Sequence, residues 1–230
     1  MAAYLVLISG EKLHVEDNRI KDEDGRERIF HGTNVVNKLE PFVPTNLETF
    51  DAMYSFNEED IDFLASLGYN TLRLGLMWQG AEPIEGQFNQ TYIDQIKKIV
   101  DMSAAKGITP LLNMHQDVYS RKFCGEGFPD WAMESNFNQT KHVAFPWPLA
   151  DPFEVDENLY PSRELCKSID WPDFHFTQAL SSAVGNLYDN KNGLRDKFAR
   201  FWGYVAEQFK DSEDIIGYEL INEPWAGNIY

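Results

Sequence analysis

A carboxylate and an amide directly follow an apolar segment near the end of this 230-residue chain. Residues 215–221 read IIGYELI, which predicts a short buried strand, and the next residues are Asn222, Glu223 and Pro224. The proline ends strand pairing because it has no backbone N–H. In a barrel of parallel strands, polar residues at the carboxyl ends of the strands are usually catalytic. We therefore take Asn222 and Glu223 as candidate catalytic residues.

Polar side chains also accompany three earlier apolar segments, over 29–36, 69–78 and 108–115, which are predicted to be strands. Alternate residues share one face of a strand. On these faces, or just beyond them, lie Asn34, Lys38, Arg73, Asn113, His115, Asp117, Glu219 and Glu223. Burying such groups unpaired is costly, so their occurrence on four strands together indicates a site rather than packing. Glu219 alone has a plainer explanation, as a buried partner of Arg73 or of another barrel cation.

Helical patterns alternate with these strands. Helices are predicted over 57–67, 91–106, 177–188 and 194–210, the first capped by Asn57 or Ser55 and ended by Gly68. This alternation predicts right-handed βαβ units in a parallel sheet. We expect an α/β protein with the (β/α)₈ TIM-barrel fold, of which about the first four βα units are present, as one incomplete domain over residues 1–230. Residues 1–10 are expected to form an edge strand rather than a signal peptide, since they lack a basic beginning.

The composition restricts the partners of the chain. A net charge of −17 argues against nucleic acid and against electrostatic adhesion to anionic membranes. No apolar run approaches the roughly 18 residues of a membrane span. Asn89 and Asn138 begin glycosylation sequons, which favours secretion or a lysosome-like compartment.

The segment from 116 to 173 is too long for an ordinary loop between a strand and a helix. It contains Cys124 and Cys166, the two cysteines of the chain, and a disulfide between them is plausible in an oxidising compartment. It also contains the tryptophans Trp131, Trp147 and Trp171. Loops after barrel strands form the active-site face, so these rings are candidates for contact with a ligand. A hydrophobic cluster that pins the loop is the other interpretation.

Taken together, the strand motifs resemble glycoside hydrolase family 5. The matching residues are Gly32-x-Asn34, Leu72-Arg73-Leu74, His115 and Asn222-Glu223-Pro224. Within that family, three stretches look like endoglycoceramidases, which release the whole oligosaccharide from glycosphingolipids. These stretches are MHQDVYS at 114–120, GFPDWA at 127–132 and NVVNK at 34–38.

The resemblance implies a role for each matching residue. It makes Glu223 the general acid/base and Asn222 a ligand of the sugar 2-hydroxyl. Arg73 would support the nucleophile electrostatically, and His115 would shape the subsite at the scissile bond. Lys38 and Asp117 would bind sugar hydroxyls, with Asn34 a further substrate-binding residue. The resemblance implies no cofactor and no metal, and the expected partner is a glycosphingolipid or oligosaccharide, with peripheral contact to lipid.

The resemblance covers residues 28 to 228, the N-terminal half of the family's barrel. A retaining glycosidase needs two carboxylates about 5–5.5 Å apart, and in this family the second comes from a later strand. We therefore expect a fragment that lacks the nucleophile and has no turnover by itself, because Asp117 is better placed to hold a sugar hydroxyl than to attack. Two alternatives stay open: an endo-β-glucanase or mannanase of the same fold, and a non-catalytic half-barrel that binds glycolipid or protein.

Overall fold

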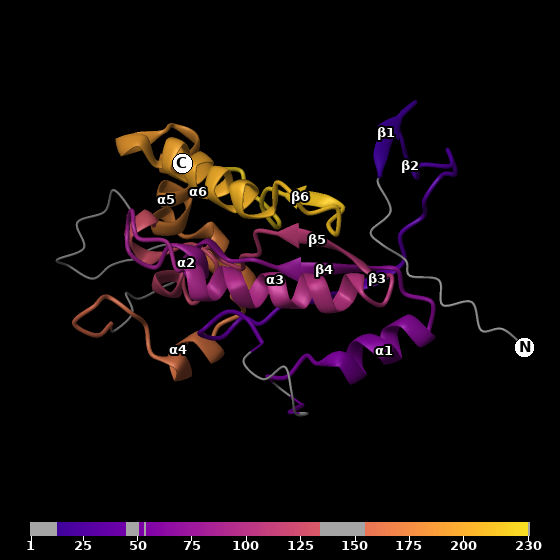
Figure 1. Ribbon diagram of the computed structural model, residues 1–230. Helices are drawn as coiled ribbons and strands as arrows, with labels where there is room; N and C mark the ends of the chain where they lie inside the picture. The colour runs from indigo at the N-terminus through magenta and orange to yellow at the C-terminus, as the bar shows by residue number, and fades with distance from the viewer. Residues whose placement is uncertain (1–12, 45–50, 53, 134–154, 230) are drawn as a thin grey trace, which may run out of the picture. The chain divides into compact units, whose positions relative to one another are not determined.

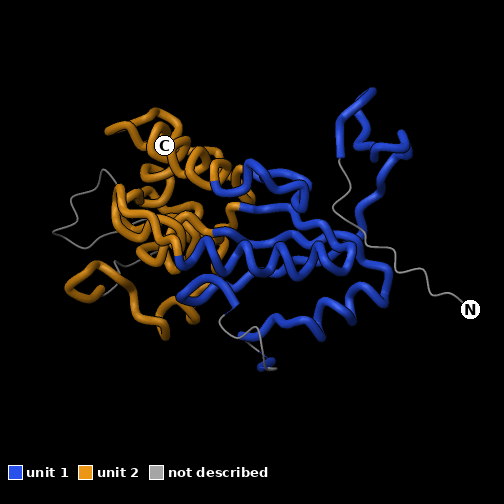
Figure 2. Tube along the Cα trace, viewed as in Figure 1, with its two compact units in different colours: residues 1–76, 91–113, 208–219 blue, residues 77–90, 114–207, 220–230 orange. Residues whose placement is uncertain are grey.

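The computed structural model describes residues 13–44, 51–52, 54–133 and 155–229. The chain divides into two compact units, which Figure 2 distinguishes by colour. Unit 1 comprises residues 1–76, 91–113 and 208–219, and unit 2 comprises 77–90, 114–207 and 220–230. The predicted edge strand over 1–10 lies outside the described residues. Among the described residues, no helix combines the length and the apolar character needed to cross a membrane.

The main sheet of unit 1 has four parallel strands in sequence order (Figure 1). They are β3 (Gly32–Val35), β4 (Thr71–Gly75), β5 (Thr109–Asn113) and β6 (Gly217–Glu219). The predicted strands, their order and their parallel pairing are confirmed. Each strand is shorter than predicted. Leu76, for example, lies beyond the end of β4, although it is fully buried and its backbone N–H donates to the carbonyl of Asn113 at 2.7 Å.

Two helices of unit 1 show why these residues are helical: one has a capped N-terminus, and the other has a buried apolar stripe. Helix α1 (Glu58–Ser66) begins at Asn57, whose side chain accepts hydrogen bonds from the backbone N–H groups of Glu59 and Asp60. The Asp60 carboxylate accepts from the backbone N–H of Asn57 and completes a capping box. Helix α3 (Gln90–Ala104) buries one stripe, formed by Tyr92, Ile93, Ile96, Ile99, Val100 and Ser103.

A small hairpin of unit 1, β1 (His14–Glu16) with β2 (Arg19–Lys21), was not predicted. Asp17 and Asn18 form its turn with φ of 52° and 61°. Two-residue hairpin turns require this left-handed backbone, and Asp and Asn tolerate it well. The Asp-Asn pair was therefore the signal that sequence reasoning overlooked.

Unit 2 packs around a buried tryptophan. Its helices are α2 (Trp78–Ala81), α4 (Arg163–Lys167), α5 (Gln178–Tyr188) and α6 (Leu194–Phe209), the last two residues of α6 belonging to unit 1. Short 3₁₀ turns span Arg121–Phe123, Asp130–Ala132, Trp171–Phe176 and Lys191–Gly193. The fully buried Trp78 ring lies 5.2–5.7 Å from the rings of Phe128, Trp131, Phe198 and Phe201. These aromatic contacts form the core of the unit.

The segment after β5 is tied to this core by side chains. Trp131 packs on Trp78 and donates to the carbonyl of Glu82 at 3.1 Å, so the hydrophobic-cluster interpretation holds for this ring. Asp130 accepts hydrogen bonds from Ser120 at 2.7 Å and Tyr160 at 2.6 Å. The bond to Asp130, aided by burial, raises the pKa of Tyr160 to about 12, so this phenol remains a neutral donor. Trp147 lies outside the described residues.

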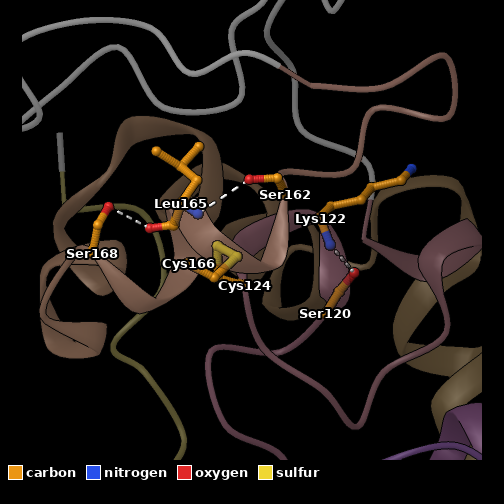
Figure 3. Close-up of a disulfide and its surroundings, with 7 residues drawn as sticks. All are labelled: Ser120, Lys122, Cys124, Ser162, Leu165, Cys166 and Ser168. Carbon is orange, nitrogen blue, oxygen red and sulfur yellow. Dashed lines mark hydrogen bonds between the residues drawn. A yellow bond between two sulfur atoms is a disulfide. The ribbon is translucent and has the colours of Figure 1, made fainter.

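A disulfide joins Cys124 to Cys166 across 42 residues of sequence (Figure 3). Cys166 lies in α4, which begins at Ser162, whose hydroxyl accepts from the backbone N–H of Leu165 at 3.1 Å. Cys124 ends the 3₁₀ turn that Ser120 caps through the backbone N–H of Lys122. The bond therefore links two very short helical segments that could not stand alone.

Replacing both Cys124 and Cys166 with serine is expected to destabilise the protein by up to about 4 kcal/mol, the chain-entropy figure for a loop of this length. The measurement is urea unfolding under non-reducing conditions, with parent and variant compared. The control is a reductant, which should lower the stability of the parent and leave the double variant unchanged. Equal stabilities without reductant would show that the bond adds nothing.

Candidate functional site

The candidate residues fall into two groups, one in each compact unit. Unit 1 carries Asn34, Lys38, Arg73 and Glu219, and unit 2 carries His115, Asp117, Asn222 and Glu223.

In unit 1, Arg73 and Glu219 form a two-pronged ion pair. The Arg73 Nε donates to one carboxylate oxygen of Glu219 at 2.6 Å, and Nη2 donates to the other. Arg73 lies on β4 and Glu219 on β6, with β5 between them, so the pair spans one strand. About a quarter to a third of each side chain is exposed, at 26% and 32%. The predicted pairing of Glu219 with Arg73 is confirmed, although the pair is partly exposed rather than buried.

Asn34 belongs to the same group. Its side-chain oxygen accepts from Arg73 Nη1 at 3.3 Å, and the two residues are paired in the register of β3 with β4. The three contacts fix the guanidinium plane, because bidentate pairing restricts an arginine in both position and orientation. Lys38 is exposed in the segment after β3. The electrostatic and sugar-binding roles of these residues stay predictions.

In unit 2, a buried glutamine links the chain after β5 to the chain after β6. Gln116 is 1% exposed, and its Nε2 donates to the carbonyl of Asn222 at 2.8 Å and to that of Glu223 at 3.2 Å. In return, Asn222 Nδ2 donates to the carbonyl of Gln116 at 2.9 Å. The Gln116 Oε1 accepts from the backbone N–H of Tyr119 at 2.8 Å. We call these four hydrogen bonds the Gln116 clip.

The clip holds Glu223 in an unusual backbone conformation. Glu223 has φ of 38°, which non-glycine residues adopt rarely, while its side chain is exposed. The prediction that the strand continues to Ile221 is wrong, since β6 ends at Glu219. Beyond Glu219 the backbone leaves the register of β5 with β6, since the N–H that donates to the carbonyl of Met114 is that of Asn222, at 2.9 Å, rather than that of Leu220. A strained backbone at an exposed carboxylate is typical of functional sites.

Two tyrosines hold the residues that follow Glu223. The Tyr119 hydroxyl accepts from the backbone N–H of Trp225 at 2.9 Å, and the Tyr188 hydroxyl donates to the Trp225 carbonyl at 2.6 Å. Burial raises the pKa of the Tyr119 phenol well above its ordinary value, so it stays protonated. Glu223 is therefore fixed from the Asn222 side by Gln116 and from the Trp225 side by two phenols.

His115 and Asp117 lie close together, as their shared strand face predicts. His115 Nε2 is 3.5 Å from Asp117 Oδ2, and His115 is 7% exposed. Asp117 also pairs with Glu126 in an isolated antiparallel bridge. Val118 and Tyr119 follow with φ of 50° and 63°. Sequence reasoning assigned no role to Gln116 or Glu126, although both lie in or beside the stretches that carried the resemblance.

An aromatic group lies beside this part of unit 2. The His175 ring is 5.6 Å from that of Trp171 and 4.9 Å from that of Trp225, and Phe176 is 5.3 Å from Trp225. Trp171 is 52% exposed, so it stays a candidate for contact with a ligand. Burial lowers the pKa of His175, and a hydrogen bond with the Pro172 backbone and then the charges of Glu223 and Asp117 partly oppose that shift. His175 gave no signal in the sequence, because its neighbours come together only in the folded loop.

The chain is similar to proteins of one glycosyl hydrolase family. A family model described as cellulase (glycosyl hydrolase family 5) matches residues 35–161. An endoglycoceramidase of Cyanea nozakii is 47% identical over 216 residues, which cover 94% of this chain and 42% of that protein. An endoglycoceramidase of Hydra vulgaris is also 47% identical over 216 residues, with 94% of this chain and 41% of that protein covered.

A solved structure of an endo-glycoceramidase is also similar to this chain. Endo-glycoceramidase II from Rhodococcus sp., in a complex with ganglioside GM3, superposes with a TM-score of 0.64 at 26% identity, covering 91% of this chain and 43% of that one. The chain therefore spans less than half the length of the relatives that it matches.

Proposed function

Because the chain belongs to the cellulase family, glycosyl hydrolase family 5, we propose that the protein hydrolyses the β-glycosidic bond between oligosaccharide and ceramide in glycosphingolipids. The observation that carries this proposal is the similarity to endoglycoceramidases along almost the whole chain. The family membership confirms the resemblance seen in the strand motifs. It also confirms the fold as a TIM barrel, to which the four parallel strands of unit 1 belong.

In the proposed reaction, Glu223 is the general acid/base. Its carboxyl group protonates the oxygen of the departing ceramide and later deprotonates the water that releases the sugar. Asn222 binds the 2-hydroxyl, while His115, Asp117, Lys38 and Asn34 contact the sugar. The fixed backbone of Glu223 supports this role, since an acid must be held within hydrogen-bonding reach of the leaving oxygen. Arg73 supports the nucleophile electrostatically.

A retaining mechanism also requires a nucleophilic carboxylate about 5–5.5 Å from the acid. We assign that nucleophile to a barrel strand outside the aligned segment, since more than half of each relative's length lies there. The complete reaction is therefore a property of the whole barrel.

A second candidate function is hydrolysis of β-glucans, and one observation favours it: the matching family model is described as cellulase. The two candidates differ in what occupies the leaving-group side. A glycosphingolipid presents an apolar ceramide there, whereas a glucan presents another sugar.

The proposal extends to the compartment and to the lipid. We place the protein in an oxidising compartment, outside the cell or lysosome-like. The disulfide supports this, as does the exposure of the sequon residue Asn89. The second sequon residue, Asn138, lies outside the described residues. Peripheral contact with a lipid surface would bring the ceramide bond to the site.

The test uses a chimera in which this chain replaces the aligned segment of the Hydra vulgaris endoglycoceramidase; we call it the Hydra chimera. It is expected to release intact oligosaccharide from a fluorescent glycosylceramide and to leave cello- and manno-oligosaccharides uncut. The unmodified Hydra enzyme is the reference. A folded chimera that cleaves cello-oligosaccharides but no glycosphingolipid would support the second candidate instead.

A further inference from the structure

Three side chains between residues 115 and 126 converge beside the Gln116 clip. Single ligand atoms of His115, Asp117 and Glu126 all lie within 4.8 Å of one another. We propose that these three residues bind a divalent transition-metal ion of the Zn²⁺ type. The proposed reaction has no use for such an ion, so the site goes beyond it.

The backbone directs the three side chains to one side. Asp117 and Glu126 face each other in the antiparallel bridge and exchange both backbone hydrogen bonds, at 3.1 and 2.9 Å. Residues opposite each other in such a bridge point to the same face, and a residue two positions earlier, His115, points there too. One imidazole and two carboxylates therefore converge on the same side of the chain.

Two glycines hold Glu126 in this position. A Cβ on Gly125 would lie 1.9 Å from the carbonyl oxygen of Asp117, and one on Gly127 would lie 2.5 Å from that of His115. Gly127 also has φ of 117°, which disfavours any side chain. The Gly-Glu-Gly stretch can therefore lie flush against the chain after β5, and only its central residue presents a side chain.

The ligand chemistry and the spacing fit zinc. Zn²⁺ accepts imidazole nitrogen together with carboxylate oxygen, whereas Ca²⁺ and Mg²⁺ prefer oxygen alone. With zinc bonds of about 2.1 Å, two ligand atoms of a tetrahedral site lie about 3.4 Å apart. The His115 Nε2 to Asp117 Oδ2 distance is 3.5 Å, so these two ligands already stand at the required spacing. Glu126 would complete the set by a small shift of its carboxylate.

If the proposed function holds, the ion and the sugar compete. His115 and Asp117 are assigned to sugar contacts, and a metal bound to both would occupy their lone pairs. Zn²⁺ is then expected to inhibit the Hydra chimera competitively with the glycosphingolipid. This consequence rests on the proposed function, but the binding of the ion does not.

The test measures binding directly, by titrating the purified chain with Zn²⁺ in a calorimeter and with Co²⁺ in a visible spectrometer. Mutating a residue that only hydrogen-bonds to a metal ligand lowers metal affinity about 10- to 100-fold. Glu126→Gln and Asp117→Asn change proposed ligands themselves, so each should weaken Zn²⁺ binding at least about tenfold. Glu157→Gln is the matched control, since it removes one exposed carboxylate of the same unit. It should leave the affinity unchanged.

The parent chain should give one Zn²⁺ per molecule at this site and the intense Co²⁺ absorption of a low-symmetry, four-coordinate ion. Circular dichroism confirms that each variant keeps the fold. The proposal would be overturned if the parent, Glu126→Gln and Asp117→Asn bound Zn²⁺ with equal affinity. It would also be overturned if Glu157→Gln lost as much Zn²⁺ affinity as the two ligand variants. Zinc binding by the chain without any glycosidase activity of the chimera would support the metal site and contradict only the proposed function.

Discussion

Replacing Glu223 with glutamine in the Hydra chimera is expected to slow hydrolysis of a natural glycosphingolipid by about 100- to 10,000-fold, the usual contribution of general acid–base catalysis. Glutamine has nearly the same shape, and the bonds that fix this position are made to backbone atoms of Asn222, Glu223 and Trp225. The fold should therefore be kept while the proton is lost. The measurement is kcat on a fluorescent glycosylceramide.

The leaving group provides the discriminating comparison for this variant. An aryl glycoside with a very acidic phenol departs without protonation, so formation of the glycosyl-enzyme should be far less affected on that substrate. Glu157→Gln, which changes an exposed carboxylate, should behave like the parent on both substrates. Equal losses on natural and activated substrates would mean that Glu223 is not the acid.

Replacing Gln116 with methionine is expected to lower kcat about 100-fold while KM changes less, because a shift of about 1 Å in a catalytic group can cost that much. Methionine matches the length of glutamine but cannot donate to the carbonyls of Asn222 and Glu223. Gln116 acts through Glu223, so it is a positioning residue. The expected signature is a larger loss on the natural lipid than on the activated aryl glycoside.

The same variant should also be less stable. Leaving a buried hydrogen-bonding group unsatisfied costs about 1–3 kcal/mol. Gln87→Met, at an exposed position of the same unit, is the control and should change neither activity nor stability. A Gln116→Met chimera with parental kcat, or with equal losses on both substrates, would show that the clip does not position the acid.

The parts of the fold that follow from periodicity and capping could be predicted from the sequence. The parallel strands and the helices α1, α3, α5 and α6 were each marked by an apolar pattern with clear ends. Asn57 shows how a cap fixes a helix start, since its carboxamide satisfies two backbone donors of α1. The exact strand ends were not predictable in this way. The end of β6, for example, comes where the backbone leaves the register with β5, and no apolar pattern marks that point.

Some residues of the candidate site could likewise be predicted from the sequence, and others could not. Arg73 with Glu219, and His115 with Asp117, were predictable because strand register and alternation bring them together. Glu126 was not, because it reaches Asp117 only when a loop folds back through two glycines. Gln116 was missed for a related reason: its partners are backbone carbonyls, which no side-chain pattern records.

The Cys124–Cys166 bond also determines what a protease could do to this molecule. A cut at any peptide bond between the two cysteines would open the chain but leave both pieces joined through sulfur. The piece with His115 and Asp117 would stay attached to the piece with Asn222 and Glu223. Such a nicked protein would migrate as one species on a non-reducing gel and separate into two only after reduction. The candidate residues on either side of the loop would thus remain part of one covalent molecule.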